Sequence, residues 1–142
     1  MTGNGEVRFI GMVESVGETS IIHVYDEYCS GLLRVGEYSH LILLYWMHMR
    51  DNQRHRGVLQ VTPHRHEGAP LTGVFACRSP SRPNPLGMTV VGLVRVNGCK
   101  IHVVGLDALE GSPIVDIKPY LPRGDSFPDA RTPEWTDRGP PT

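Results

Sequence analysis

Short runs of hydrophobic residues, each followed by turn-forming residues, recur along most of the chain. Four of them occupy residues 7–14, 20–26, 57–62 and 73–76, with Gly17 in the turn region between the first two. Runs that are rich in β-branched residues and bounded by glycine, proline or asparagine are typical of β-strands. We therefore predict a short strand in each of these runs.

Longer strands are expected elsewhere in the pattern. Residues 39–48 are hydrophobic on both faces, as in a central buried strand. Residues 86–96 alternate with period two, and the Asn97-Gly98 dipeptide separates them from a further run at residues 100–106. Asn-Gly is the strongest short-range hairpin signal, so we predict that these two runs pair. Residues 113–117 form the last predicted strand.

Helical periodicity is weak, and only residues 28–36 are expected to form a helical turn or short helix. Several short strands with regular turns favour a closed or nearly closed antiparallel barrel, so the predicted fold class is all-β with few short helices. The strand–helix alternation of a Rossmann-type enzyme is missing. We predict a barrel domain at residues 1–122 and an irregular, proline-rich C-terminal tail at residues 123–142.

The length of 142 residues suits one domain with a real core. No hydrophobic run reaches the ~20 residues of a membrane helix, and the first residues lack the pattern of a signal peptide, so no membrane partner is expected. The three cysteines, Cys29, Cys77 and Cys99, are odd in number and widely spaced. We expect buried, unpaired thiols in a protein of the reducing cytoplasm.

Charge is segregated along the chain, although the net charge is only −1. Residues 48–84 contain six arginines, no lysine and only two acidic residues, which gives this segment a charge of +4 and leaves −5 for the rest. Phosphate contacts dominate nucleic-acid affinity, so the segment is a candidate RNA track with Arg54, Arg56 and Arg65 as phosphate ligands. A solvated basic face is the alternative.

The most unusual stretch of the sequence is a stiff, cationic loop at residues 77–87. Its three prolines leave few backbone conformations. Arg78 and Arg82 present donor forks suited to carboxylates and phosphates, and the Asn84 amide both donates and accepts hydrogen bonds. Such a loop between two hydrophobic runs favours a binding site on a rigid scaffold. The alternative is an ordinary proline-rich connection with solvated arginines.

The sequence of this loop, RSPSRPNPLG at residues 78–87, closely resembles the signature of the TsaA-like (TrmO) family. The blocks GLDALEGSPIVDIKPYLP at residues 105–122 and EYSHL at residues 37–41 are similar to two further family motifs, in the family's order. The resemblance implies a β-barrel enzyme that uses S-adenosylmethionine to methylate N6 of threonylcarbamoyladenosine, next to the tRNA anticodon. It also implies a homodimer with sites near the interface.

One segment departs from the family pattern. Many members have an additional loop after the first strand, which contacts the cofactor, whereas residues 10–15 here lead directly into the next strand. The extra C-terminal domain of bacterial members has no counterpart in this sequence. We therefore expect a short form like that of archaeal relatives, in which the partner chain of a dimer replaces the missing contacts.

The resemblance also implies roles for individual residues. Family positions at the S-adenosylmethionine pocket correspond here to His48, Met49, Arg78, Thr89, Val90, Glu110, Gly111, Ser112 and Pro113. The last four match a family turn with the sequence DGTP, so Glu110 is one methylene longer than the usual aspartate and Ser112 replaces threonine. Arg82 and Lys118 fall on motif positions of the substrate side.

The candidate catalytic residues are Asp116, Asn84 and Tyr120, again from the family motifs. The acceptor nitrogen of the family substrate is attached to a carbonyl group and is a weak nucleophile, so a base such as Asp116 would help by removing its proton. Asp116 could instead form a cross-strand charge pair with Lys118, and Tyr120 could close the barrel with a buried ring. His40 is expected to be a satisfied core histidine rather than a catalyst.

Two other functions stay open at this point. One is an S-adenosylmethionine-dependent methyltransferase of a small molecule, and the other is a non-catalytic RNA-binding module. A metal-binding module would need ligands from four histidines, but no carboxylate or thiol lies at a convincing spacing from His48, His55, His64 and His66. No metal site is predicted.

Overall fold

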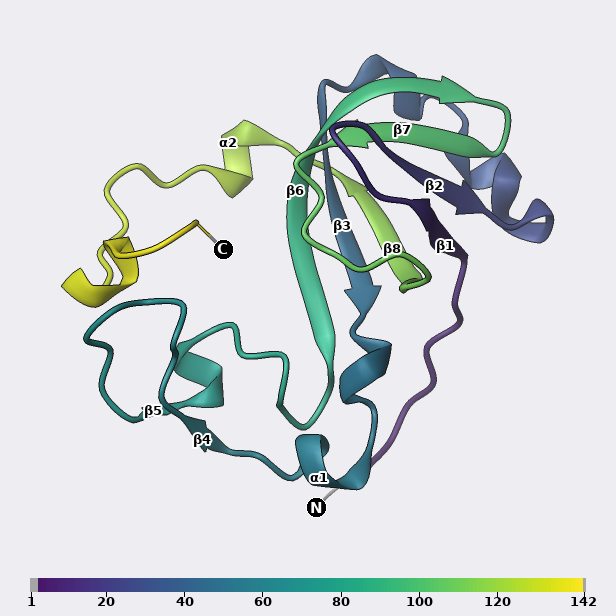
Figure 1. Cartoon of the computed structure of the whole chain (residues 1–142). Coiled ribbons are helices and arrows are strands. Elements are labelled where there is room, and N and C mark those ends of the chain that lie inside the picture. The colour runs from purple at the N-terminus through teal and green to yellow at the C-terminus, as the bar shows by residue number, and fades with distance from the viewer. Residues whose placement is uncertain (1–2, 142) are drawn as a thin grey trace. The chain divides into compact units, whose positions relative to one another are not determined.

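The computed structural model describes residues 3–141, and their contacts separate into two units (Figure 1). The first, which we call the barrel unit, comprises the chain up to Trp46 together with Gly87–Tyr120. The second, the loop unit, comprises Met47–Leu86 and the chain from Leu121 onward. The residues predicted to carry chemistry are therefore divided between two units.

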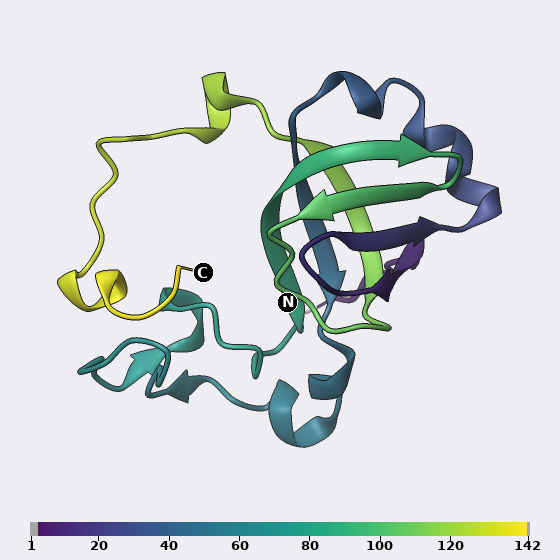
Figure 2. The same ribbon diagram turned by 45° about the horizontal axis from the view of Figure 1, so that its top comes forward.

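Six strands close into a barrel (Figure 2). In neighbouring order they are β1 (Gly11–Ser15), β2 (Ser20–Val24), β7 (Lys100–Val104), β6 (Leu86–Asn97), β3 (His40–Trp46) and β8 (Pro113–Pro119). β8 pairs with β1 to complete the ring, and the pairs β1–β2, β2–β7, β6–β7, β3–β8 and β1–β8 are antiparallel. The predicted all-β antiparallel barrel is confirmed.

Alternating burial along the strands gives the barrel its core. In β3, Leu41 and Leu43 are almost completely buried, whereas Ile42 and Leu44 are half-buried. The other strands contribute mainly β-branched side chains, namely Val13, Ile22, Val24, Val91, Ile101, Val103 and Ile114. Burial of each such side chain contributes about 1.5–3 kcal/mol. Closure also removes free strand edges, so strands of five residues suffice for β1, β2 and β7.

The hairpin at Asn97-Gly98 forms as predicted. Asn97 pairs with Lys100 across the turn, and Gly98 has a φ of 62°, which favours glycine. β1 is shorter than the strand predicted at residues 7–14, because the pairing with β2 and β8 begins only at Gly11.

The two short strands predicted in the loop unit are reduced to a small sheet. β4 (Gln60–Val61) pairs with β5 (Thr72–Gly73), and the 3₁₀ helix η4 (Val74–Ala76) follows. The strand predicted at residues 73–76 is therefore mostly wrong. Its composition favours a strand, but only the residues opposite β4 find a pairing partner.

Helices are few and short, as predicted. The helix expected at residues 28–36 is divided into the 3₁₀ helices η1 (Asp26–Leu32) and η2 (Val35–Glu37), because Arg34 has a φ of 71°. The others are η3 (His48–Arg50), α1 (Gln53–Arg56), α2 (Pro122–Asp125) and η5 (Glu134–Asp137). None of the helices between residues 3 and 141 is long and apolar enough to cross a membrane.

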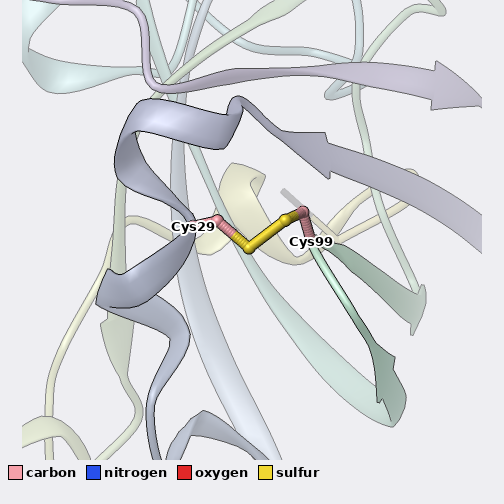
Figure 3. The surroundings of a disulfide bond; sticks show 2 residues. All are labelled: Cys29 and Cys99. Atoms are coloured by element: carbon pink, nitrogen blue, oxygen red, sulfur yellow. A yellow bond between two sulfur atoms is a disulfide. The ribbon is translucent and has the colours of Figure 1, made fainter.

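The cysteines correct one prediction. Cys29 and Cys99 form a disulfide that joins η1 to the β6–β7 turn, across 70 residues of sequence (Figure 3). Barrel closure brings the two segments together, and the Val24 amide donates to the Cys99 carbonyl oxygen at 2.8 Å. A pair that distant has no local spacing signal, so the prediction of unpaired thiols was wrong for these two residues. Cys77 is a half-buried free thiol.

The C-terminal segment is ordered by contacts within the loop unit. The Trp135 ring lies 5.5 Å from the His66 ring, and His66 Nδ1 lies 2.6 Å from the Arg138 carbonyl oxygen, to which it donates. The Arg138 guanidinium in turn donates to the Glu67 carbonyl oxygen at 3.0 Å. The predicted tail thus holds the turn at residues 63–67 in place.

Candidate functional site

A pocket of about 560 Å³ lies in the loop unit. Three stretches form its walls: Arg50 at the end of η3, residues 61–66 from the last residue of β4 onward, and residues 77–81 at the start of the proline-rich loop. The volume is in the range of small-molecule sites. The pocket therefore brings the start of the proline-rich loop together with Arg50 and residues 61–66 of the basic segment.

The pocket wall is cationic. Arg50, Arg65 and Arg78 line it together with His64 and His66, and no aspartate or glutamate is among the lining residues in the described part of the chain. Guanidinium groups recognise carboxylates and phosphates through paired hydrogen bonds. The composition of the wall is that of an anion site.

Arg50 is held by two neutral side chains. Its Nη1 lies 3.2 Å from Ser81 Oγ and 3.3 Å from His55 Nδ1, and the Ser81 and His55 atoms are 2.8 Å apart. A guanidinium only donates, so His55 Nδ1 accepts and the ring is neutral, with its proton on Nε2. Desolvation lowers the pKa of His55 below its ordinary value, and the charges of Arg50 and Arg54 lower it further.

Arg56 fastens the proline-rich loop to α1. Its Nε donates to the Pro83 carbonyl oxygen at 2.8 Å and its Nη2 to Asn84 Oδ1 at 3.2 Å, while its Nη1 pairs with Asp51 at 3.0 Å. Asn52 caps the helix by accepting from the His55 amide at 2.9 Å. The guanidinium of Arg56, a predicted phosphate ligand, is thus engaged in positioning the loop.

Arg82 closes the same loop on itself. Its Nη1 donates to the carbonyl oxygens of Cys77 and Ser79, both at 3.1 Å. Arg54, in contrast, is exposed on α1, and Arg65 and Arg78 are exposed at the pocket wall. Arg54 and Arg65 were predicted to contact RNA, and Arg78 was predicted to contact the cofactor.

The predicted cofactor residues are divided between the units. His48 and Met49 in η3 and Arg78 in the loop belong to the loop unit. Thr89 and Val90 on β6 belong to the barrel unit, as does the turn at residues 110–113.

Two of these residues carry buried polar atoms without a hydrogen-bond partner among the described residues. They are His48 Nδ1 and Thr89 Oγ1. Buried polar side-chain atoms are nearly always bonded, so each such atom in a native structure indicates a missing partner or a function. Both positions fit a cofactor that carries hydroxyl, amino and carboxylate groups.

The turn at residues 110–113 is built rigidly against β1. Gly111 donates to the Val13 carbonyl oxygen at 2.8 Å, and the Val13 amide donates to the Ser112 carbonyl oxygen at 2.9 Å. Gly111 has a φ of 86°, which favours glycine, and Ser112 is buried. Glu110 is exposed. The backbone conformation of Gly111 and the burial of Ser112 therefore account for these two residues of the turn without any ligand.

The candidate base Asp116 lies on β8 in a charge pair. Its Oδ2 is 3.0 Å from Lys118 Nζ and its Oδ1 accepts from the Ile117 amide at 2.9 Å. A cross-strand charge pair between Asp116 and Lys118 was predicted as the alternative to a catalytic role. The charge pair is present, but both residues lie on the same strand, two positions apart.

Tyr120 and Asn84, the other candidate catalytic residues, lie in different units. Tyr120 is half-buried at the end of β8, with its ring 6.3 Å from that of His40. Asn84 is exposed and held by Arg56. His40 itself is exposed, so the prediction of a core histidine was wrong: it occupies the first, outward-facing position of β3 and contacts Ser39 Oγ at 2.8 Å.

Comparison with known proteins decides the family. The family model of the tRNA-methyltransferase O N-terminal domain matches residues 12–126. The chain belongs to this family. The TrmO resemblance of the sequence motifs is thereby confirmed.

Archaeal proteins named as S-adenosyl-L-methionine-binding proteins are among the relatives. A probable S-adenosyl-L-methionine-binding protein of Methanocaldococcus jannaschii is 38% identical over 109 residues, which cover 77% of this chain and 86% of that protein. One of Archaeoglobus fulgidus is 44% identical over 114 residues, which cover 80% of this chain but only 30% of that protein. At the level of the family, the predicted use of S-adenosylmethionine is confirmed.

A mouse tRNA (adenine(37)-N6)-methyltransferase is 39% identical over 95 residues, which cover 67% of this chain and 21% of that protein. Among solved structures, TrmO from Pseudomonas aeruginosa matches with a TM-score of 0.75 and 26% identity, over 98% of this chain and 66% of that one. This chain thus spans about two thirds of the solved TrmO chain, and much less of some relatives.

The TrmO motifs did not reveal the cluster of Arg50, His55 and Ser81. Arg50 was visible only as one of six basic residues in the segment 48–84. Its partner Ser81 lies 31 residues further along the chain, so the hydrogen bond between them has no sequence signal. The presence of Ser81 in the RSPSRPNP motif was the one available indication of this cluster.

Proposed function

We propose that this protein uses S-adenosylmethionine to methylate N6 of threonylcarbamoyladenosine, next to the anticodon of tRNA. The observation that carries the proposal is the match of residues 12–126 to the TrmO family model, together with relatives named as S-adenosyl-L-methionine-binding proteins and as a tRNA (adenine(37)-N6)-methyltransferase. The cationic pocket of the loop unit supports a polyanionic substrate.

Several residues of this chain would hold the cofactor. S-adenosylmethionine supplies a methyl group that is already activated on a sulfonium, so the protein has mainly to align donor and acceptor. His48 Nδ1 and Thr89 Oγ1 would gain hydrogen-bond partners on the cofactor, and Arg78 would bind its carboxylate or ribose hydroxyls. Met49, Val90 and the turn at residues 110–113 would complete the contacts.

On the acceptor side, the protein has one proton to remove. The N6 atom of threonylcarbamoyladenosine carries a single hydrogen, and in this proposal the Asp116 carboxylate accepts it as the N6–methyl bond forms. The Lys118 ammonium lies 3.0 Å from Asp116 Oδ2 and would hold the carboxylate in place on β8. Tyr120 and Asn84 would orient the base, Arg54 and Arg65 would contact RNA phosphates, and Arg56 and Arg82 would act by shaping the loop.

A methyl-transfer assay tests this proposal. The purified protein is incubated with isotopically labelled S-adenosylmethionine and with tRNA that does or does not carry threonylcarbamoyladenosine, and the nucleosides are analysed by mass spectrometry. We expect methylated threonylcarbamoyladenosine from the modified tRNA only. Methylation of the unmodified adenosine would support a tRNA methyltransferase but contradict threonylcarbamoyladenosine as its substrate. The absence of a labelled nucleoside from every tRNA would contradict the proposal.

A non-catalytic RNA-binding module is the second candidate. The contacts of Asp116 favour it, because both carboxylate oxygens are already engaged, Oδ2 with Lys118 Nζ and Oδ1 with the Ile117 amide. RNA binding without labelled product would support this candidate.

We further propose that the protein is a homodimer, as the resemblance implies, and that it is located in the cytoplasm. Light scattering on the purified protein tests the dimer. Disulfides are rare in the cytosol outside hyperthermophiles, so the Cys29–Cys99 bond makes localisation a useful second measurement.

A further inference from the structure

The pocket of the loop unit contains a cation that the proposed function does not use. That function assigns Arg78 to the cofactor and Arg65 to RNA, but Arg50 to nothing. We infer that the pocket binds a phosphate group of an RNA backbone, with Arg50 as its central ligand. The inference rests on the proposed function for the identity of the partner as RNA, and it assigns a specific phosphate site within the basic segment.

Arg50 keeps its full charge in the pocket. The side chains that contact it are Ser81 and His55, both neutral, and none of the described residues provides an acidic partner. The adjacent carboxylate of Asp51 pairs with Arg56 instead, at 3.0 Å. A guanidinium held by neutral partners attracts an anion more strongly than one already neutralised.

The surrounding groups complete an anion site of suitable size. Arg65 adds a second guanidinium group, and Ser79 and Ser81 add hydroxyls to the wall. A volume of about 560 Å³ is larger than a phosphate alone and leaves room for the adjoining sugar and base. A backbone phosphate therefore suits the pocket better than a small isolated anion.

The site is also preorganised. Pro63 and Pro80 stiffen two of its walls, and the Ser81 amide donates to Ser79 Oγ at 3.3 Å. Arg50 is fixed in place by Ser81 and by the neutral ring of His55. Fixing a long side chain before binding reduces the entropy lost when the ligand arrives.

The rival occupant is the carboxylate of S-adenosylmethionine, because guanidinium groups bind carboxylates and phosphates with the same geometry. Two measurements separate these ligands. Fluorescence anisotropy gives the affinity for a labelled tRNA anticodon stem-loop transcript at several KCl concentrations, without methyl donor. Calorimetry gives the affinity for S-adenosylmethionine, without RNA.

The variants are Arg50→Gln, Arg50→Lys and the matched control Arg131→Gln, which removes an exposed charge of the same unit outside the pocket. For Arg50→Gln we expect RNA affinity about 10- to 100-fold lower, as for the loss of a charged hydrogen bond. The slope of log affinity against log salt should fall in magnitude by about 0.7–0.9, the value for one phosphate contact. S-adenosylmethionine affinity should stay unchanged.

Arg50→Lys and a further variant, Ser81→Ala, check the physical cause, and Arg131→Gln is the control. Arg50→Lys keeps the charge but loses the planar fork, so it should restore the salt slope and only part of the affinity. Arg131→Gln should leave both unchanged. Ser81→Ala removes one of the two acceptors of Arg50 without changing any charge. It should weaken RNA binding at an unchanged slope even if Arg50→Gln unfolds the protein.

Three results would overturn the inference: an unchanged salt slope in a folded Arg50→Gln, an equal effect in Arg131→Gln, or a loss of S-adenosylmethionine binding in place of RNA binding. Failure of the proposed function has a different signature. RNA binding that depends on Arg50, without any methylated nucleoside, would support the phosphate site and contradict the methyltransferase. Methylation by the wild-type protein, together with a salt slope of RNA binding that does not change in Arg50→Gln, would support the methyltransferase and contradict the phosphate site.

Discussion

At the scale of single residues, hydrogen-bonding capacity decides which side chains are free to meet a ligand. Arg56 and Arg82 direct their donors to carbonyl and amide oxygens of the proline-rich loop. Among the residues described by the structure, the side-chain partners of Arg50 at the pocket wall are neutral groups. Arginines that look equivalent in the sequence therefore have different roles, which the acceptors around each of them determine.

The neutral ring of His55 predicts a pH dependence of stability. Its folded-state pKa lies below the ordinary value of 6.5, so the unfolded chain binds more protons. The contribution of the neutral His55 ring to the free energy of unfolding is therefore fully present above about pH 6.5. It is lost as the pH falls from there through the lowered pKa. We expect a smaller drop in melting temperature between pH 7.5 and pH 5 for His55→Asn than for the wild type. Equal drops would contradict this.

Thr89 predicts opposite effects on stability and on cofactor binding. Thr89→Val keeps the shape and removes a buried hydroxyl without a partner among the described residues. Removing such a group costs nothing or stabilises by up to about 1 kcal/mol, since its desolvation is no longer needed. We expect an equal or higher free energy of unfolding and roughly 5- to 10-fold weaker S-adenosylmethionine binding, as for one hydrogen bond. Denaturant unfolding and calorimetry measure the two effects, and unchanged cofactor affinity would show that Thr89 does not meet the cofactor.

At the scale of elements, the close approach of β6 to β3 requires a glycine at the end of the proline-rich loop. Gly87 begins the barrel part of β6, and a Cβ added there would lie 2.4 Å from the ring of Tyr45. Tyr45 is buried, and its hydroxyl donates to the Asp107 carbonyl oxygen. The ring cannot move without breaking that hydrogen bond, so the glycine of the family motif has a packing reason.

This contact predicts a clear loss of stability on substitution. Gly87→Ala should lower the free energy of unfolding by about 1–3 kcal/mol, as overpacking typically does. Gly31→Ala is the matched control, because nothing lies within 4 Å of the added Cβ. Chemical denaturation of both variants measures the difference, and similar stabilities would mean that Tyr45 relaxes without cost.

At the scale of the whole molecule, the chain is constrained by one long-range covalent link. The Cys29–Cys99 disulfide closes a loop of 70 residues that contains β3, the first part of the loop unit and β6. Such a link reduces the entropy of the unfolded chain far more than that of the native barrel. It also makes the fold sensitive to the redox state of its surroundings.

Removal of the disulfide should therefore be costly. The double variant Cys29→Ser with Cys99→Ser should lose about 2–4 kcal/mol of unfolding free energy. Cys77→Ser, the control with a free thiol, should change stability by less than about 1 kcal/mol, since its sulfur makes weak contacts at 3.6 and 4.0 Å. Urea unfolding of the oxidised proteins gives the comparison, and equal midpoints for the wild type and the double variant would contradict the expected role.

Features of the fold that depend on neighbouring residues could be predicted from the sequence, and features that depend on distant residues could not. Period-two alternation at residues 86–96 and Asn97-Gly98 placed the central hairpin, because both signals are local. Strand ends at Gly11 and beyond Gly73 could not be placed, since pairing partners decide them. The domain division at residue 122 stays a prediction.

By itself, the sequence determined the all-β barrel, the family and the segregation of basic charge, because these follow from side-chain pattern and order along the chain. Tertiary structure alone decided the Cys29–Cys99 bond, the clamp of Arg56 on Asn84 and the support of Arg50 by Ser81. Each of these joins residues about 30 or more positions apart, which only the folded chain brings within bonding distance. Hydrogen bonds and disulfides act over a few ångströms of space, and distance along the sequence does not reveal that proximity.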